Sequence, residues 1–308
     1  LSLYRADVAA LLGRQSLKTT APRVSRGLVA FQAAVATLLA AGSFTLVRTM
    51  YAIRDQDPGF RRERLVVMTV DPWTAGLRVG KGGALVEEAV RRARAIPGVE
   101  EVSVAQRALM RGIGFKANVG RDGHRIAFAD SLNASLNGVS ENHFANMGMR
   151  ILAGRGFTEA DAKAKPLPVV VSRSFARQFF VDGDPVGQAI GTASIGSVVK
   201  GDRVIVGVVS DAKYRGMREV PPPTVYTPVA PGDFDGAALH VRVRRDPAEV
   251  MAALRAMLAG VGPGLTPAEI GTMEQDIETS VWQERLLAAL SGLFAGVAVE
   301  LASIGLFG

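Results

Sequence analysis

The sequence predicts a membrane protein in which two transmembrane helices with stalks flank an extracytoplasmic α+β domain. An uncharged apolar run extends over residues 28–47, and a second run over 286–308 is interrupted only by Glu300. A helix of about 20 apolar residues crosses the hydrocarbon core of a bilayer. The residues between the runs are mixed in polarity, which favours spanning helices over the buried helices of a soluble core.

The first apolar run follows a basic segment, residues 1–26, in which five Arg or Lys side chains stand against Asp7. A signal peptide would have a shorter apolar core and a shorter charged leader. Basic residues next to a spanning helix favour the cytoplasmic side. We therefore predict a cytoplasmic segment at 1–26, a first transmembrane helix with its stalk at 27–58 and an extracytoplasmic domain at 59–272. This charge lies beside a membrane helix, so no nucleic-acid partner is expected.

The two ends of the middle domain show the same pattern. Residues 64–106 and 238–272 each read as strand, helix and strand, and apolar residues in both helical stretches recur at spacings of three and four. Two βαβ units predict a ferredoxin-like sheet assembled from both ends of the domain. The insert between them, 107–231, is predicted to be a β-rich subdomain. Its hairpin turns are expected at Asp122-Gly123 and Gly201-Asp202.

The last part of the chain, 273–308, is predicted to form the second stalk and transmembrane helix, with the chain ending within or at the end of the span. No Gly or Pro stands between Met273 and the second apolar run, so one continuous helix is expected. Gly292, Gly296 and Glu300 share one helical face. Small residues allow close helix approach, and an acid within a bilayer needs a polar partner. We predict that this face packs on a neighbouring helix or protomer; the alternative is an acid tolerated near one end of the span.

The polar residues give no sign of catalysis. The chain has no cysteine, and its three histidines, His124, His143 and His240, lack a second histidine at i+3 or i+4 that could complete a metal pair on a helix. Ser172 and Ser174 lack the G-x-S-x-G setting of a nucleophile, so helix capping is the predicted role. The glycine-rich stretch 76–83 has neither the spacing of a phosphate loop nor its Ser or Thr. We predict no catalytic, cofactor-binding or metal-binding residue and no enzyme activity.

The segment 138–161 combines His143 with several carboxylates and glycines, and it could be read as an active site. Residue types instead favour a connector. Ser140 is the expected N-cap of a short helix, Gly148 its C-terminal stop, and a strand and turn follow.

Three segments resemble the periplasmic core domain of MacB-like, FtsX-type ABC transporter permeases. They are "VSENHFANMGMRILAGRGFTEAD", "VVVSRSFARQFFVDGDPVGQAIG" and "IVGVVSDAKYRGMREVPPPTVYTPV", in this order between the apolar runs. The positions that carry the resemblance are Gly148, Gly154, Arg155, Phe157, Pro185, Gly187, Gly207, Asp211 and Tyr226. The chain departs from the family at Ser172-Arg173, where an Asn-Glu pair is expected, and at Glu300, where the family has an aliphatic residue.

The resemblance implies a non-catalytic permease subunit in the bacterial cytoplasmic (inner) membrane, with residues 59–272 in the periplasm. Such a subunit couples ATP hydrolysis by a separate cytoplasmic ABC ATPase to movement of its extracytoplasmic domain, a mechanotransmission used in export or efflux. ATP and Mg would be bound by that partner and no cofactor by this chain. The resemblance further implies contact with the lipid bilayer, a dimer or pseudo-dimer of permease halves, and a chain that is a fragment of a duplicated orphan permease. The alternative is a membrane-anchored extracytoplasmic sensor or scaffold.

Overall fold

The computed structural model describes residues 22–54, 56–72, 76, 82–111, 115–130, 133–181, 183–234, 236–261 and 269–307. The chain divides into two compact units: Leu1–Tyr51 with Gln283–Gly308, called here the helical unit, and Ala52–Trp282, called the domain. Most of the predicted basic segment, residues 1–21, and most of the glycine-rich stretch, residues 77–81, lie outside the described residues.

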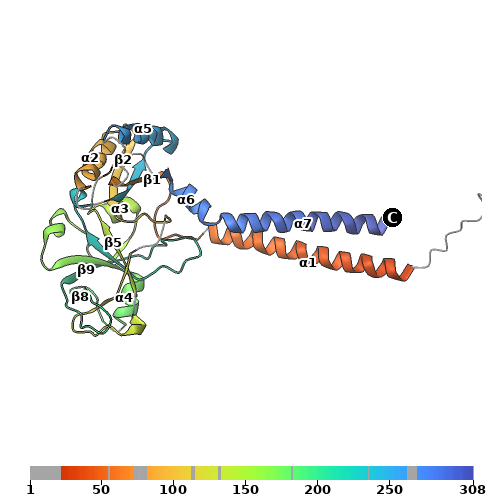
Figure 1. Ribbon diagram of the computed structural model, residues 1–308, viewed down its shortest axis with the longest axis horizontal. Coiled ribbons are helices and arrows are strands. Elements are labelled where there is room, and N and C mark those ends of the chain that lie inside the picture. Colours follow the sequence, from red (N-terminus) through yellow and green to blue (C-terminus); the bar gives the residue numbers. More distant parts are fainter. Residues whose placement is uncertain are drawn as a thin grey trace, which may run out of the picture. The chain divides into compact units, whose positions relative to one another are not determined.

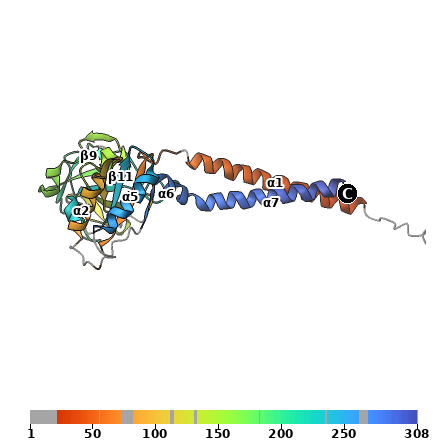
Figure 2. The same ribbon diagram turned by 90° about the horizontal axis from the view of Figure 1, so that it is seen from above.

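The helical unit consists of the two long helices of the chain (Figures 1 and 2). Helix α1 runs over Pro22–Arg54 and helix α7 over Trp282–Phe307. At 1.5 Å per residue they are about 50 and about 39 Å long. Among the described residues, one stretch is long and apolar enough to cross a membrane, Ala30–Ile53 of α1. Among the described side chains, the large apolar ones of both helices are mostly exposed; the buried positions are Ala36, Ser43 and Ala295, together with Ile53 at the end of α1.

The predicted continuous helix from Met273 is wrong. Helix α6 covers Met273–Ser280, and α7 begins only at Trp282. Helix α6 is started by a capping box between Thr272 and Gln275, and its apolar residues Met273 and Ile277 are buried in the core of the domain together with Val281. These three apolar residues are four positions apart, a spacing that a stalk helix could also show. Here it packs α6 onto the domain, and α6 ends where this packing ends.

Four strands of the sheet come in turn from the C-terminal and the N-terminal end of the domain. They are β1 Leu65–Val70, β2 Val99–Ala105, β11 Ala237–Val243 and β12 Ile270–Thr272. Their order is β12-β1-β11-β2, with β11 antiparallel to both β1 and β2, and β12 antiparallel to β1. Helix α2, Gly83–Arg94, joins β1 to β2, and α5, Pro247–Ala259, joins β11 to β12. Each helix therefore links two parallel strands that have one strand between them, as in a ferredoxin-like sheet.

The remaining strands continue this sheet. They are β3 Phe115–Ala117, β4 Val119–Arg121, β5 Ala134–Val139, β6 Ile151–Gly154, β7 Leu167–Ser172, β8 Ala189–Thr192, β9 Arg203–Val209 and β10 Thr224–Pro228. Strand β5 pairs with β2 at Ala105 and Val139, and the order then runs β5-β10-β7-β9-β8-β4, with β3 on β5 and β6 on β9. The insert thus extends the sheet of the domain. Its helices are α3 His143–Met147 and α4 Arg173–Phe179, with short 3-10 turns η2 Phe128–Asp130, η3 Glu159–Lys163 and η4 Pro231–Asp233.

The two hairpins predicted in the insert are wrong, although the chain does turn at Asp122-Gly123. Strand β4 pairs with β8, and β9 pairs with β6, β7 and β8. Beyond the first turn, Arg125 forms a bridge with Val198, and Asp122 Oδ1 accepts a hydrogen bond from Gly201 N at 2.7 Å. The turn at Asp122-Gly123 and Arg125, which follows it, therefore pair with the segment 198–201. Turn residues indicate a reversal of the chain, but they do not select the partner strand.

The four-stranded part of the sheet is buried on both faces, and the side chains of β1 alternate between them. Val66, Met68 and Val70 join a core with helices α2 and α5, which lie together on one face (Figures 1 and 2). Leu65 and Val67 point the other way, into a core that contains residues of α3. A strand covered on both faces is expected to be almost entirely apolar, and Thr69 is the one polar residue of β1.

Candidate functional site

In the described part of the chain, no group of three or more His, Cys, Asp or Glu side chains could hold a metal ion. The most specific interactions lie where the chain enters and leaves the domain. We call residues 56–63, which follow α1, the leading segment, and α6, which precedes α7, the trailing helix.

The leading segment is held on one side by the motif that follows β9. Lys213 N donates to Pro58 O at 3.0 Å, and Lys213 Nζ donates to Gln56 Oε1 at 2.5 Å and to Met217 O. Burial lowers the pKa of Lys213. Gly59 has φ +88°, and a Cβ there would lie 1.8 Å from Asp211 O. Only glycine allows this approach, so the segment is fixed in position at its backbone.

The other side of the leading segment is held by α3 and by Arg242 of β11. Arg61 N donates to Met147 O at 2.7 Å, at the end of α3. The Arg242 guanidinium donates to Asn146 O (Nε, 2.8 Å), to Glu63 O (Nη1, 2.9 Å) and to Arg61 O (Nη2, 3.1 Å). Burial lowers the pKa of Arg242 to about 10, so the side chain is still charged at neutral pH. The buried Arg242 cation thus links β11 to α3 and to the leading segment. The three carbonyls that it binds lie at a helix end or outside regular structure, where no backbone N–H of a described helix or strand bonds them.

Two buried histidines, one in α3 and one in β11, pack against each other. The rings of His143 in α3 and His240 in β11 are 5.3 Å apart, centre to centre. His143 Nδ1 is 3.5 Å from Ser103 Oγ, whereas neither ring nitrogen of His240 has a hydrogen-bond partner among the described residues. Burial lowers the pKa of His143 to about 3 and that of His240 well below its ordinary value. His124, the third histidine, is exposed in a turn. The pair is thus a neutral part of the core.

The signature segment 138–161 has a structural role throughout. Arg155 donates to both carboxylate oxygens of Asp161, from Nη1 at 2.6 Å and from Nη2 at 3.0 Å, and Asp161 Oδ2 accepts from Thr158 N at 2.7 Å. These bonds lower the pKa of Asp161 to about 2. Gly148 ends α3 with φ +67°, which confirms the predicted stop. Ser140 is not the N-cap: Asn142 occupies that position, and Ser140 Oγ instead accepts from Val104 N at 2.9 Å.

The other positions that carry the family resemblance also support the backbone. A Cβ at Gly154 would lie 2.2 Å from Val206 O, and one at Gly207 would lie 2.1 Å from Arg155 O. Gly187, which follows Pro185 by two residues, has φ +86° and donates to Ile205 O at 2.7 Å. Asp211 Oδ1 accepts from Ser174 N at 2.7 Å. Aromatic packing places the Phe144 ring 5.1 Å from that of Tyr226 and 5.5 Å from that of Phe157.

Capping roles were predicted for Ser172 and Ser174. The prediction is confirmed for Ser172, whose Oγ accepts from Phe175 N at 3.2 Å at the start of α4. Ser174 Oγ donates to Pro222 O instead.

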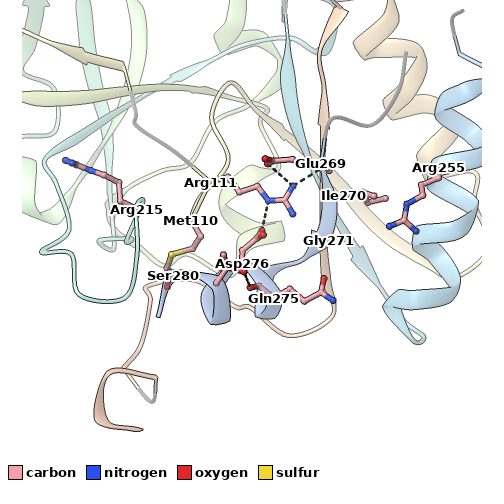
Figure 3. A pocket seen from close by; sticks show the side chains of 11 residues that line it. Met110, Arg111, Arg215, Arg255, Glu269, Ile270, Gly271, Gln275, Asp276 and Ser280 are labelled. Atoms are coloured by element: carbon pink, nitrogen blue, oxygen red, sulfur yellow. Dashed lines mark hydrogen bonds and ion pairs between the residues drawn. The ribbon is translucent and has the colours of Figure 1, made fainter. Parts of the chain in front are cut away.

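The trailing helix is held by an ion pair. Arg111 Nε donates to Asp276 Oδ2 at 2.6 Å, and Arg111 Nη1 donates to Glu269 O at 3.3 Å (Figure 3). The two paired side chains are only 8% and 15% exposed. Burial raises the pKa of Asp276, and the hydrogen bond from Arg111 opposes that rise. Because the partners are 165 residues apart, no sequence pattern could have paired them. Arg242 alternates with apolar residues along β11, a pattern that by itself indicates a solvent-facing side chain, so its burial could not be predicted from the sequence either.

Gly292, Gly296 and Glu300, the predicted packing face of α7, are exposed in the helical unit. A Cβ at either glycine would meet no atom within 4 Å. The structure therefore leaves this face open, and its packing on another helix or protomer stays a prediction.

Comparison with known proteins identifies the class to which this fold belongs. Residues 32–260 match the family described as the MacB-like periplasmic core domain, so the chain belongs to that family. The crystal structure of the periplasmic region of MacB from Actinobacillus actinomycetemcomitans is similar, with a TM-score of 0.51, at 15% identity, over 74% of this chain and 97% of that one. The domain is therefore a mixed α+β domain of the kind found in the periplasmic part of an ABC-type transporter permease.

Two relatives show the similarity at the level of sequence. The macrolide export ATP-binding/permease protein MacB of Neisseria gonorrhoeae is 39% identical over 59 residues, which are 19% of this chain and 9% of that protein. The protein named MacB 1/2 of Paracoccus denitrificans is 32% identical over 100 residues, 32% of this chain and 14% of the relative. The matched segments thus span only a small part of the relatives' length. These findings confirm the family resemblance stated from the motifs.

Proposed function

We propose that this chain is part of a non-catalytic permease subunit of an ABC-type transporter in the bacterial inner membrane. It would couple ATP hydrolysis by a separate cytoplasmic ATPase, which binds the ATP and Mg, to movement of the periplasmic domain in export or efflux. One observation carries the proposal: a single buried cluster contains Ile53 from the end of α1, Phe60 from the leading segment, Phe144 of α3 and Ile277 of the trailing helix. Both routes from the long helices into the domain therefore meet in one core.

Such a core suits mechanical transmission. Interiors are close-packed and resist compression, so displacement of one member is passed to its neighbours. The leading segment is tied to the sheet by Arg242 and Lys213, and the trailing helix by Arg111. A pull on α1 or α7 would thus move the domain as a body instead of unravelling its ends.

The surface of the helical unit supports the membrane part of the proposal. Phe31, Leu38 and Phe44 of α1 are 66–73% exposed, and Leu287, Leu293 and Phe294 of α7 are 57–62% exposed. Contiguous apolar surface of this kind needs cover, and lipid provides it. We therefore propose that both helices span the bilayer and that the open face at Glu300 packs in a dimer or pseudo-dimer of permease halves. The names of the relatives favour this permease over the alternative of a sensor or scaffold.

Distance measurement in the complete transporter tests the proposal. The chain has no cysteine, so Tyr51→Cys and Leu286→Cys, both at exposed positions near the domain, can be labelled selectively with nitroxides. We expect the distance distribution between the two labels to change between the nucleotide-free and the ATP-bound complex. A partner ATPase that cannot bind ATP is the control and should abolish the change. A distribution that is identical in all nucleotide states would overturn the proposed coupling.

A further inference from the structure

A groove of about 760 Å³ lies in the domain beside the trailing helix (Figure 3). Its walls come from α6, from β12 and from α5, with Arg111 between Glu269 and Asp276 in the middle and with Arg215 and Arg255 on opposite sides. The volume is that of a small-molecule or headgroup site. No role in the fold accounts for it, since the core beneath is closed by Met273 and Ile277.

The Arg111 guanidinium has hydrogen-bond donors left over for a ligand. Nε and Nη1 are used by Asp276 and by Glu269 O, but Nη2 makes no hydrogen bond to any residue that the structure describes. A guanidinium carries five N–H donors in a fixed plane. The side chain is 8% exposed, and it borders the groove. A nearly buried cation with open donors is what an oxyanion site requires.

Gly271 keeps the space over this nitrogen open. It lies within β12, where glycine weakens a strand, and its φ is not positive, so backbone conformation does not require it. A Cβ at this position would lie 3.1 Å from Arg111 Nη2 and 3.2 Å from Gln275 Oε1. Any side chain at 271 would therefore press against the guanidinium and close the approach from the groove.

Arg255 is the cation of the groove that is left for an anion. The lining carries three guanidiniums and two carboxylates, and both carboxylates, those of Glu269 and Asp276, lie next to Arg111. Arg215 is paired with Glu219 at 3.1 Å, whereas Arg255, exposed on α5 at the rim of the groove, makes no ion pair among the described residues. Guanidiniums bind phosphate through two parallel hydrogen bonds, which gives them preference for that group.

We propose that this groove binds the phosphate of an anionic phospholipid headgroup, an inference that rests on the proposed membrane-spanning role of α7. Ser280 lines the groove, and Trp282, two residues later and still in the domain, is 54% exposed. Tryptophan is enriched at membrane interfaces. The apolar run begins at Leu286, about 6 Å further along a helix. The headgroup layer is itself roughly 5–7 Å deep, so chain connection alone keeps the groove within reach of headgroups.

Lipid titration of the whole 308-residue chain in detergent, followed by native mass spectrometry, tests the proposal. We expect one saturable site for dioleoylphosphatidylglycerol and none for diacylglycerol, which lacks the phosphate. Arg255→Gln and Gly271→Ala should each weaken phosphatidylglycerol binding about tenfold, because each removes or blocks a guanidinium contact. Arg177→Gln, at an exposed position on α4 outside the groove, removes the same charge and should change nothing. Matching unfolding midpoints show that the variants are folded.

Three results would overturn the assignment: equal phosphatidylglycerol affinity in Arg255→Gln and the unmodified chain, equal binding of diacylglycerol, or full displacement of the lipid by millimolar inorganic phosphate. The last result identifies a site for a soluble anion. Alkaline extraction of membranes separates this proposal from the proposed function. A chain that stays in the membrane but binds no headgroup contradicts only the groove assignment, whereas a chain that is extracted contradicts the membrane role itself.

Discussion

The two faces of the four-stranded part of the sheet differ in chemistry. The face under α2 and α5 is apolar at every buried position, including Leu239 and Val241 of β11. The face under α3 carries Ser103, His143, His240 and Arg242, together with the leading segment and the trailing helix. One face is built for stability alone. The other accepts buried polar groups, which cost free energy unless they are satisfied, and it thereby fixes where the two chain connections lie.

The largest difference between the faces is expected in their response to acid. Burial, helped by the positive charges of Arg111 and Arg242, lowers the pKa of His240, and burial alone lowers that of His143. Below pH 6.5 the unfolded chain takes up protons at both histidines while the folded chain does not. The free energy of unfolding therefore falls with falling pH, by roughly 2 kcal/mol per histidine between pH 7 and pH 5. Urea unfolding of the full chain, followed by circular dichroism at several pH values, measures this slope.

One variant sharpens that measurement. His240→Leu should remove about half of the histidine contribution to the slope. Equal pH dependence in His240→Leu and the unmodified chain would mean that the buried pair does not cause the acid sensitivity.

On the apolar face, Leu239→Ala should lower the free energy of unfolding by about 3 kcal/mol, since Leu239 is fully buried between the sheet and its helices. The same urea titration measures this loss. Hydrogen exchange of the leading segment should change only as much as global stability does, because Leu239 points away from it.

On the polar face, Arg242→Met should cost about 2 kcal/mol. Three backbone carbonyls lose their donor, and the loss is partly offset because a cation no longer has to be buried. Local exchange should distinguish this variant from Leu239→Ala: the Arg61 amide, bonded to Met147 O, should exchange about tenfold faster than global unfolding explains. Equal protection of this amide in both variants would show that Arg242 does not hold the leading segment.

The smallest effect is expected for Ser103→Ala. Asn146 Nδ2 donates to Ser103 Oγ at 2.8 Å, and it also donates to His240 O, so one of its two bonds survives. A loss of about 1 kcal/mol is expected from urea unfolding. A loss as large as that of Leu239→Ala would erase the proposed distinction between the faces.

The sequence could predict the elements of the apolar sheet face, under α2 and α5, better than the contacts of the polar face, under α3. Alternation and helical spacing identify β1, α2, β11 and α5, because burial requires those patterns. His240 and Arg242 are two residues apart in β11 and therefore lie on the same face of the sheet. Their partners, however, come from α3 and from residues 61 and 63, which are far away along the chain. The Arg111–Asp276 pair had no local pattern at all. The strand partners in the insert were misassigned for the same reason, since turn residues contain no information about distant strands.

The separation of α6 from α7 at Val281 has a mechanical consequence. Helix α1 keeps its last turn inside the domain, where Ile53 is 8% exposed, so rotation of α1 about its own axis would have to drag the core with it. Helix α7 meets the domain through one non-helical residue, Val281, which is 4% exposed in the same core and donates its N–H to Glu278 O at 3.2 Å. The break therefore ends one helix and starts the next without loosening the attachment of α7 to the core. We expect both helices to transmit twist as well as pull, which orientation-sensitive spin labels on the two helices would detect.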